Sequence, residues 1–307
     1  MYSFKTAFQL LKDEKIIQHN SSFIQINEGL VHDIYKIKSK KNSYFLKIRL
    51  NHFKYEKNIK IKPKDIIYEK KALEITKKYC KNFVPKIIYF KDNFLLLESM
   101  EKKLSYSVYS LLYNQSFSYT DAKNIGKQIK QFHKKISLIK TQIRSKNDEI
   151  KIYNNCLRWR FEVWNNKNLN NIVNELKHRQ KKQFIYADFN AKNMILSKNK
   201  LKIFDLELFH KGDPLFDVGF FAGHILLSFL DRPILRIKLL QSFFNGYDIK
   251  NNELQLVIKI MLATVYFRLS VKYPYAVKFD YNKKTILKKI DRLLSKNCLT
   301  LNLISNI

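Results

Sequence analysis

Carboxylate and amide side chains recur at short intervals in the stretch from Phe184 to Phe221. Asp188 and Asn193 form a D-x-x-x-x-N pair, and Asp205 follows further along the chain. An aspartate can orient or deprotonate an attacking hydroxyl, and an amide oxygen can bind a divalent metal. A nucleotide-bound Mg²⁺ takes only one or two protein carboxylates together with phosphate oxygens. These residue types at this spacing predict phosphoryl transfer from a metal-nucleotide.

Short apolar runs flank these residues. The segments FIYAD and KLKIFDLEL alternate apolar and polar positions, which is typical of short strands. We therefore expect Asp188, Asn193 and Asp205 to be presented together at one sheet edge. The alternative is a solvated loop, since D-x-x-x-x-N by itself occurs by chance in many proteins.

Two upstream elements carry further charged residues at apolar positions. The strand-like run YFLKIR, from Tyr44 to Arg49, places Lys47 among apolar neighbours. A lysine there costs desolvation unless an anion is near, and the alternative is an edge-strand lysine that faces water. The following amphipathic segment, from Asp65 to Tyr79, is predicted to be a helix that carries Glu69 and Glu74.

The remaining chain separates into a sheet-rich part and a helical part. A helix is expected from Phe4 to Ile17, and four more strand-like runs lie before Met100. From Ser105 onward the helical period dominates, with Thr120 as the expected N-cap of one helix. The stretch from Ile139 to Lys182 is polar and irregular except for CLRWRFEVW and NIVNEL, and the apolar run FDVGFFAGHILLSFL is predicted to be a buried helix. The prediction is an α+β chain with a small antiparallel-sheet lobe over residues 1–100 and a larger, mainly helical lobe over residues 101–307.

The chain is strongly basic, with 58 Lys and Arg against 26 Asp and Glu and a formal net charge of +32. Such a charge suits anionic ligands, nucleic acid or an acidic membrane surface. The lysines are spread along the chain, however, and Gly and Pro are scarce, which an AT-rich genome would impose without any binding role. We therefore expect no nucleic-acid partner and no transmembrane segment, and keep peripheral membrane contact open.

Cysteine usage and the N-terminal sequence bear on the compartment. The three cysteines lie far apart without a C-x-x-C pair, which argues against a disulfide framework or a zinc site. The N-terminal segment lacks an apolar signal core followed by a small-residue cleavage site. These features predict a reduced, cytoplasmic protein.

The chain resembles the aminoglycoside phosphotransferase and choline kinase-like family in the order of its motifs. These motifs are the strand lysine, the helix glutamate, the linker, YADFNAKN, FDLE and GDPLFDVG. The resemblance runs from about Phe23 to at least Gly223. It implies a bilobal, protein kinase-like fold and a kinase that uses ATP and Mg²⁺ to phosphorylate a small molecule with a hydroxyl group. Choline, ethanolamine, a sugar or a related alcohol are the acceptors that it leaves open.

The resemblance also implies roles for individual residues. Asp188 would be the catalytic base, with Asn193 and Asp205 as metal ligands, and Lys47 would hold the α and β phosphates. The resemblance implies three further parts of the nucleotide site. Glu69 would be the lysine's partner on the helix, Gly29 the single glycine of the nucleotide loop, and Glu98 to Met100 the interlobe hinge. Glu74, one turn after Glu69, is a competing partner for the lysine.

Further side chains have expected roles outside the chemistry. Asp217 would anchor the catalytic loop, and His133 and His224 are expected to be satisfied core histidines. Trp159 and Trp164 lie in the segment that, by resemblance, covers the acceptor pocket, where the alternative is ordinary packing. Glu207 would line that pocket or face solvent.

The sequence departs from the family in two places. Tyr186 stands where the family usually has histidine, and the nucleotide loop is poor in glycine, which weakens phosphate binding by backbone N–H groups. These departures motivate one alternative, a catalytically weak scaffold that binds nucleotide. The net charge alone motivates another, a basic module that binds RNA or an anionic membrane.

Overall fold

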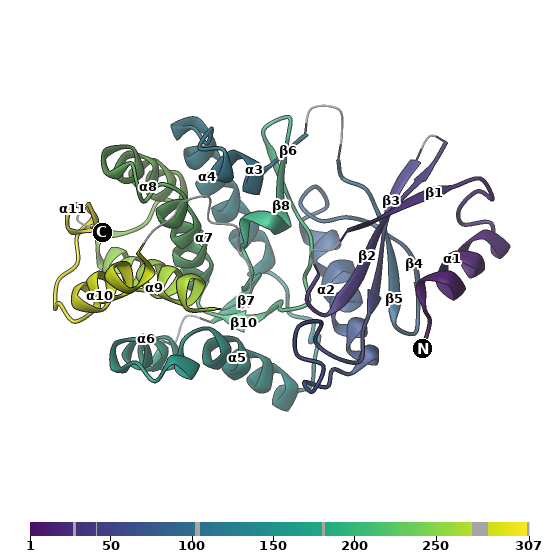
Figure 1. Ribbon diagram of the computed structural model, residues 1–307, viewed down its shortest axis with the longest axis horizontal. Coiled ribbons are helices and arrows are strands. Elements are labelled where there is room, and N and C mark those ends of the chain that lie inside the picture. The colour runs from purple at the N-terminus through teal and green to yellow at the C-terminus, as the bar shows by residue number, and fades with distance from the viewer. Residues whose placement is uncertain (27–28, 41, 102–104, 180–181, 272–281, 306) are drawn as a thin grey trace. The chain divides into compact units, whose positions relative to one another are not determined.

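The computed structural model describes the whole chain apart from residues 27–28, 41, 102–104, 180–181, 272–281 and 306 (Figure 1). The fold divides into two compact units. Unit 1 comprises Met1–Lys102, Thr141–Ile143 and Phe204–Glu207, and unit 2 comprises Lys103–Lys140, Arg144–Ile203 and Leu208–Ile307. An antiparallel sheet in the first unit and a mainly helical second unit confirm the α+β class.

Unit 1 is built on a five-stranded antiparallel sheet with the order β1-β2-β3-β5-β4. Its strands are β1 (Ser22–Ile26), β2 (His32–Ser39), β3 (Asn42–Arg49), β4 (Ile87–Lys91) and β5 (Phe94–Glu98). Its helices are α1 (Phe4–Asp13), the 3-10 turn η1 (Pro63–Asp65) and α2 (Ile66–Tyr79). The helix expected up to Ile17 ends at Asp13, and Lys15 follows it at a positive φ of 58°.

The two helices cover opposite faces of the sheet (Figure 1). Leu46 and Ile48 of β3 share a buried cluster with Ala7 and Leu11 of α1. Because successive side chains of a strand point to opposite faces, Lys47 points toward the other face, where α2 packs. β3 is a central strand, with Lys47 opposite both Ile34 of β2 and Leu95 of β5.

Unit 2 holds most of the helices and two small sheets. The helices are α3 (Val108–Tyr113), α4 (Tyr119–Ile136), α5 (Lys146–Arg160), α6 (Lys167–His178), α7 (Pro214–Ser228), α8 (Pro233–Tyr247), α9 (Asn251–Ser270), α10 (Lys283–Leu294) and α11 (Leu301–Ile304), with 3-10 turns η2 (Glu162–Trp164) and η3 (Ala191–Asn193). The strands are β6 (Ser105–Ser107), β7 (Gln183–Ile185), β8 (Met194–Ser197), β9 (Lys200–Ile203) and β10 (His210–Gly212).

The two expected strands around the aspartates form, but they do not share a sheet. β7 pairs with β10, whereas β8 pairs with β6 and β9. The prediction of one common sheet edge for Asp188, Asn193 and Asp205 is therefore wrong. The pattern of alternation shows that a segment is a strand, but it does not identify the partner strand.

Two local expectations in the helical part are also corrected. The N-cap of α4 is Ser118, whose hydroxyl accepts from the Asp121 amide in a capping box, and Thr120 lies inside the helix. The stretch from Ile139 to Lys182 is largely helical, because it contains α5 and α6. The apolar residues of α6 recur at helical spacing and are buried: Leu169, Ile172, Val173 and Leu176.

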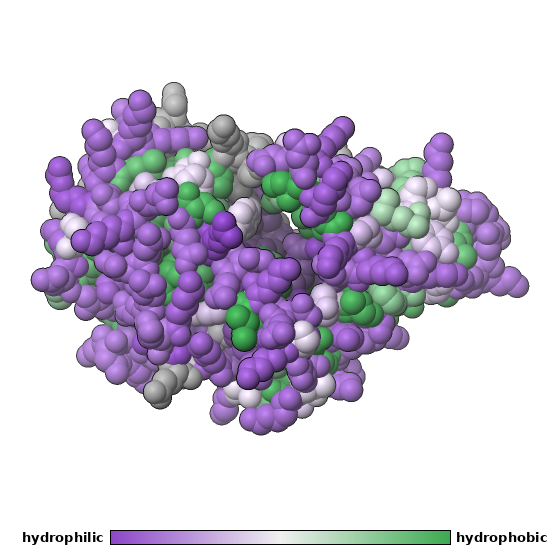
Figure 2. Space-filling view, turned by 90° about the horizontal axis from the view of Figure 1, so that it is seen from below, coloured by the Kyte–Doolittle hydropathy of each residue, from purple (hydrophilic) through white to green (hydrophobic). Residues whose placement is uncertain are grey.

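The apolar run that was expected to be a buried helix is α7, and only its last residue is not buried. In the described part of the chain, no helix combines the length and the apolar character that a membrane span requires. Hydrophilic residues cover most of the face drawn in Figure 2, and hydrophobic residues appear there as small separate patches. Hydrophilic residues are thus distributed over this face.

Helices α4 and α8 approach closely at two glycines. A Cβ added to Gly126 would lie 2.2 Å from the carbonyl oxygen of Phe243, and one on Gly246 would lie 2.1 Å from that of Lys123. Both obstacles are backbone atoms, which cannot rotate away as a flexible side chain can. Glycine is therefore required at this crossing.

We expect Gly126→Ala to lower the free energy of unfolding by about 1–3 kcal/mol, the range for overpacking. The sign is diagnostic, because alanine in a helix interior would otherwise stabilise it by about 1 kcal/mol. Urea unfolding followed by circular dichroism measures the change. Lys127→Ala, at the exposed neighbouring position, is the control and should change stability by less than about 0.5 kcal/mol.

Candidate active site

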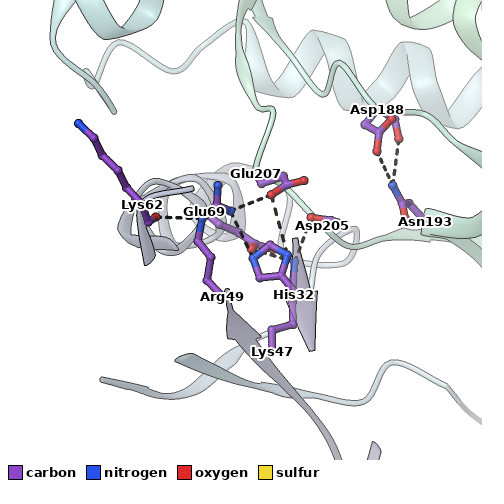
Figure 3. A network of polar contacts seen from close by, with 9 residues as sticks. All are labelled: His32, Lys47, Arg49, Lys62, Glu69, Asp188, Asn193, Asp205 and Glu207. Carbon is purple, nitrogen blue, oxygen red and sulfur yellow. Dashed lines mark hydrogen bonds and ion pairs between the residues drawn. The ribbon is translucent and has the colours of Figure 1, made fainter. Parts of the chain in front are cut away.

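Lys47 is buried and bonded to carboxylates within unit 1. Its ammonium lies 2.7 and 2.9 Å from the two carboxylate oxygens of Glu69 and 2.9 Å from Oδ1 of Asp205 (Figure 3). Only 5% of Lys47 is exposed, which excludes the alternative of an edge-strand lysine facing water. Burial lowers the pKa of Lys47, but the charges of Asp205 and Glu69 outweigh it and raise the pKa above its usual value. Lys47 is thus held as a cation.

The structure distinguishes the two candidate partners of this lysine. Glu69 lies in the first turn of α2, is 1% exposed and holds Lys47 with both oxygens. Glu74 instead forms an i,i+4 pair with Lys70 at 2.8 Å and is half exposed. Glu69 therefore pairs with Lys47, and Glu74 does not.

We expect Glu69→Gln to lower the free energy of unfolding by about 1.5–3 kcal/mol, because Lys47 loses a charged hydrogen-bond acceptor. Glu74→Gln removes a surface pair and should cost less than about 1 kcal/mol. Urea denaturation of both variants at pH 7 makes the comparison. Equal losses would contradict the assignment of Glu69.

Asp205 lies two residues after the end of β9 and has a positive φ of 70°. Non-glycine residues adopt this region rarely, although aspartate tolerates it better than most. Oδ1 of Asp205 accepts from Lys47, and no described residue bonds its Oδ2. One carboxylate oxygen is therefore held by protein and the other is available to a ligand.

A second ion pair runs beside the first. Arg49 Nη1 donates to Glu207 Oε2 at 2.9 Å, and His32 of β2 lies 3.9 Å from the same oxygen (Figure 3). The two ion pairs, Lys47–Asp205 and Arg49–Glu207, have the same spacing along the chain. Lys47 and Arg49 are two residues apart, and so are Asp205 and Glu207. Burial, with Asp205, raises the pKa of Glu207 to about 7. Glu207 pairs with Arg49 and does not simply face solvent, and its place at an acceptor pocket stays a prediction.

Sequence reasoning missed the roles of Arg49 and His32. The signal for Arg49 was its position two residues after Lys47 on one strand, since residues i and i+2 of a strand point to the same face. His32, the first residue of β2, carried no such signal.

In unit 2, Asp188 and Asn193 are in direct contact. The Asn193 amide nitrogen donates to Asp188 Oδ2 at 2.8 Å (Figure 3). No described residue bonds the side-chain oxygen of Asn193, so this oxygen is also available to a ligand. Asn193 directly precedes Met194, which pairs with Ile203 in the β8–β9 hairpin. A divalent metal bound to phosphate needs only one or two such protein oxygens, and the amide oxygen of Asn193 is a donor of this kind.

Asp217, near the N-terminus of α7, holds the loop that carries Asp188. Its carboxylate accepts from the backbone N–H of Tyr186 at 2.9 Å and of Ala187 at 2.7 Å. Ala187 has a positive φ of 63°, a costly conformation that surrounding contacts must maintain. The expected anchoring role of Asp217 is confirmed, and it is fully buried.

The histidine on α4 completes this anchor. His133 Nε2 lies 2.9 Å from Asp217 Oδ2, and its Nδ1 lies 2.9 Å from the hydroxyl of Tyr247. His133 is therefore a satisfied core residue, as expected. Tyr186, in the place of the family's usual histidine, is buried and meets Phe189 edge-on at 4.7 Å.

Arg160, the last residue of α5, contacts Asp188 from the other side. Its Nη2 donates to Asp188 Oδ1 at 3.2 Å and to the carbonyl oxygen of Ala187 at 3.0 Å. Sequence reasoning did not single out this arginine. Its signal was a basic residue among the aromatic residues of RWRFEVW, which could have indicated a buried cation.

The other predicted site residues lie apart from these contacts. A Cβ on Gly29 would come within 2.4 Å of the carbonyl oxygen of His32, so the loop's own backbone requires glycine there. Glu98 ends β5, and its carboxylate accepts from the amide of Lys86 at 2.8 Å. Met100 follows the strand and is half-buried.

The two tryptophans are engaged in packing. Trp159 meets Phe267 edge-on at 5.3 Å, and Trp164 donates from Nε1 to the carbonyl oxygen of Arg160 at 3.0 Å. The bond of Trp164 favours the packing interpretation for that residue, whereas Trp159 is 40% exposed and its place at the acceptor pocket stays a prediction.

Burial lowers the pKa of three histidines, which predicts acid sensitivity. The pKa of His210 falls to about 3, and those of His32 and His224 fall well below 6.5. Below about pH 6.5 the unfolded chain binds protons that the folded chain excludes, so the stability present at neutral pH is lost as pH falls toward 3. For His210 we expect a loss of about 1.4 kcal/mol per pH unit in this window.

Urea unfolding at pH 7.5 and pH 5 tests this expectation, with His210→Phe as the comparison variant. Because phenylalanine does not titrate, the variant should lose less stability between the two pH values than the parent. An unchanged pH dependence would exclude His210 as a contributor.

Comparisons with known proteins give three findings. A family model described as the phosphotransferase enzyme family matches residues 23–249. None of the curated proteins matches the sequence. Among solved structures, an amicoumacin kinase hAmiN, in complex with AMP-PNP, Ca²⁺ and Ami, is 11% identical with a TM-score of 0.61, over 95% of this chain and 93% of that one.

Two further structures have the same fold at low identity. An ethanolamine kinase from Plasmodium vivax is 15% identical with a TM-score of 0.56, over 97% of this chain and 90% of that one. The choline kinase LicA from Streptococcus pneumoniae is 15% identical with a TM-score of 0.56, over 95% of this chain and 98% of that one. At these identities the likeness extends to the fold.

Proposed function

Because the chain belongs to the phosphotransferase enzyme family, we propose that it is a kinase that moves the γ-phosphoryl group of ATP onto a hydroxyl of a small molecule. The observation that carries this proposal is the presence of two groups of polar side chains that bond to one another. Lys47 is held by Glu69 and Asp205, and Asp188 is held by Asn193 and Arg160. Apart from Arg160, these are the side chains to which the resemblance to the family assigns a role in phosphoryl transfer.

In this proposal Lys47 binds the α and β phosphates of the nucleotide. Its pairing with Glu69 keeps the ammonium charged and fixes its direction before a nucleotide arrives. Gly29 lies in the nucleotide loop, and backbone groups of Glu98 to Met100 form the adenine hinge.

The free oxygens of Asp205 and Asn193 would hold Mg²⁺. When bound, the metal neutralises the charge of the phosphate oxygens. The chain's own contribution is to fix each donor: Lys47 holds one oxygen of Asp205, and Asp188 holds the amide nitrogen of Asn193.

Asp188 would orient the acceptor hydroxyl and receive its proton. In phosphoryl transfer through a loose transition state, positioning and charge stabilisation dominate over base strength. Asp188 accepts from Arg160 at Oδ1 and from Asn193 at Oδ2, and these bonds help to place the carboxylate. In this proposal Asp188 is the catalytic base, and its placement contributes together with its acceptance of the proton.

The acceptor is a small alcohol in this proposal. Relatives with the same fold are an ethanolamine kinase and a choline kinase, and a sugar or a related alcohol is an equal candidate. A polycationic acceptor needs an acidic pocket, and the net charge of +32 disfavours one.

The proposal is tested by measuring ADP release from Mg²⁺-ATP with a panel of choline, ethanolamine, sugars and other alcohols. A kinase will release ADP with at least one acceptor, and omission of Mg²⁺ or the change Asp205→Ala will abolish the release. Release that is independent of both would contradict the assigned metal site.

The second candidate is a nucleotide-binding scaffold without turnover, motivated by Tyr186 and the single glycine of the nucleotide loop. It predicts that Mg²⁺-ATP raises the melting temperature while no member of the panel releases ADP. The contacts of Asp217 with the backbone of Tyr186 and Ala187 favour the kinase, because the loop keeps a fixed conformation around the tyrosine.

A further inference from the structure

Arg160 is a buried cation in contact with the proposed catalytic carboxylate. It is 1% exposed, and Asp188 Oδ1 accepts from its Nη2 at 3.2 Å. A guanidinium removed from water is costly unless an anion and further acceptors compensate it. We propose that Arg160 is a positioning residue that holds Asp188 in the orientation required for phosphoryl transfer. This inference rests on the proposed function.

The guanidinium joins the helix α5 to the loop that carries Asp188. Nη2 also donates to the carbonyl oxygen of Ala187 at 3.0 Å, next to Asp188. Nη1 donates to the sulfur of Cys156, one turn earlier on α5, at 2.6 Å. Burial raises the pKa of this thiol to about 11, so the sulfur is a neutral acceptor. Arg160 therefore contacts both the side chain of Asp188 and the backbone before it.

Aromatic rings limit the freedom of the arginine. The guanidinium carbon lies 4.9 Å from the ring centroid of Phe220, 5.7 Å from that of Phe216 and 5.6 Å from that of Trp159. Cation–π attraction to these faces favours a guanidinium over a neutral group. The Trp164 indole N–H bonds the Arg160 carbonyl oxygen, which adds a restraint on the backbone.

The two oxygens of Asp188 are bonded to different elements. Arg160 of α5 bonds Oδ1, and Asn193 at the end of η3 bonds Oδ2. A carboxylate bonded on both oxygens cannot rotate without breaking one bond. Loss of Arg160 would remove the bond from α5 to Oδ1 and weaken the restraint on the orientation of Asp188.

Lysine cannot fully replace arginine in this arrangement. The planar guanidinium presents donors in a fixed fork, which here serve Asp188, Ala187 and Cys156 together. An ammonium on a flexible stem keeps the charge but reaches fewer of these acceptors. Arg160→Met should remove all of these bonds. Arg160→Lys should keep part of them and therefore have a kcat between those of the parent and Arg160→Met.

The test compares kcat and KM for ATP, with the acceptor from the panel that gives the fastest ADP release. We expect Arg160→Met to lower kcat by about 10²-fold, the cost of misplacing a catalytic group by about 1 Å, and to leave KM for ATP within about 2-fold. Arg160→Lys should recover part of kcat. In the Asp188→Asn background, Arg160→Met should cause no further loss, because the arginine acts through Asp188.

Arg236→Lys is the matched control. Arg236 is also fully buried in unit 2, but it donates to the carbonyl oxygens of Leu230 at 3.0 Å and Ile304 at 2.7 Å. It should lower the melting temperature without the selective loss of kcat. The same kcat loss in this control, or an undiminished effect of Arg160→Met in the Asp188→Asn background, would overturn the positioning role.

Amide hydrogen exchange of residues 187–193 tests the same role without turnover. Arg160→Met should speed exchange in this loop, whereas Arg236→Lys should leave it unchanged. If no acceptor is phosphorylated, the proposed function fails, and the exchange result still decides whether Arg160 orders the loop. Equal exchange in the parent and Arg160→Met would refute that ordering.

Discussion

Asp188→Asn is expected to lower turnover about 10²–10⁴-fold, the contribution of a well-placed general base. Asparagine has nearly the same shape, but it cannot take the proton of the acceptor hydroxyl. It also gives Arg160 a neutral partner in place of a carboxylate. ADP release at saturating Mg²⁺-ATP measures the effect.

The control for this variant is Asp231→Asn, at an exposed aspartate of unit 2 that accepts from Gln115 at 2.9 Å. It should retain parental turnover. The stabilisation of Asp188→Asn by Mg²⁺-ATP in a thermal melt should also remain, since Lys47 and Glu69 are unchanged. Equal turnover in Asp188→Asn and the parent would remove Asp188 from the base role.

Asp217→Ala is expected to cost about 3–5 kcal/mol of stability, as breaking a buried pair does. The change leaves the backbone N–H groups of Tyr186 and Ala187 and the imidazole of His133 without this acceptor. A loss of this size is a large fraction of the free energy of unfolding of a typical protein, which is about 5–15 kcal/mol. Urea unfolding at pH 7 measures it.

Asp217→Asn separates hydrogen bonding from the loss of volume. It keeps one acceptor oxygen, so its stability should fall between those of the parent and Asp217→Ala. Both variants should lower turnover, because Ala187 at positive φ depends on this contact. If Asp217→Ala were as stable as the parent, the anchoring role would be wrong.

Residue order was enough to recognise the family. The family match over residues 23–249 confirms the family that the motifs indicated. These motifs contain Lys47, Asp188, Asn193, Asp205 and GDPLFDVG. These side chains carry the signal because phosphoryl transfer needs particular functional groups at particular separations along the chain. Strand alternation and helix periodicity predicted the sheet-rich and helical parts for a similar reason, since each is a property of near neighbours.

The segment from Ile139 to Lys182 was the least well predicted part of the helical unit. The polar stretch that forms α5 and α6 was assigned as mostly irregular, because charged residues mask the buried stripe of Leu169, Ile172, Val173 and Leu176. Arg160 was overlooked for a related reason. A buried arginine looks like any surface arginine until its partners are known.

The sequence determined which residues could do chemistry and which segments are strands or helices. The tertiary structure decided the pairings: Glu69 in place of Glu74 with Lys47, Arg49 with Glu207, Arg160 with Asp188, and the separate sheets of β7 and β8. The physical reason is that these contacts join residues far apart in the chain. Burial, partner geometry and charge compensation decide which of several residues of the same type forms such a contact. Local sequence patterns carry no information about these three quantities.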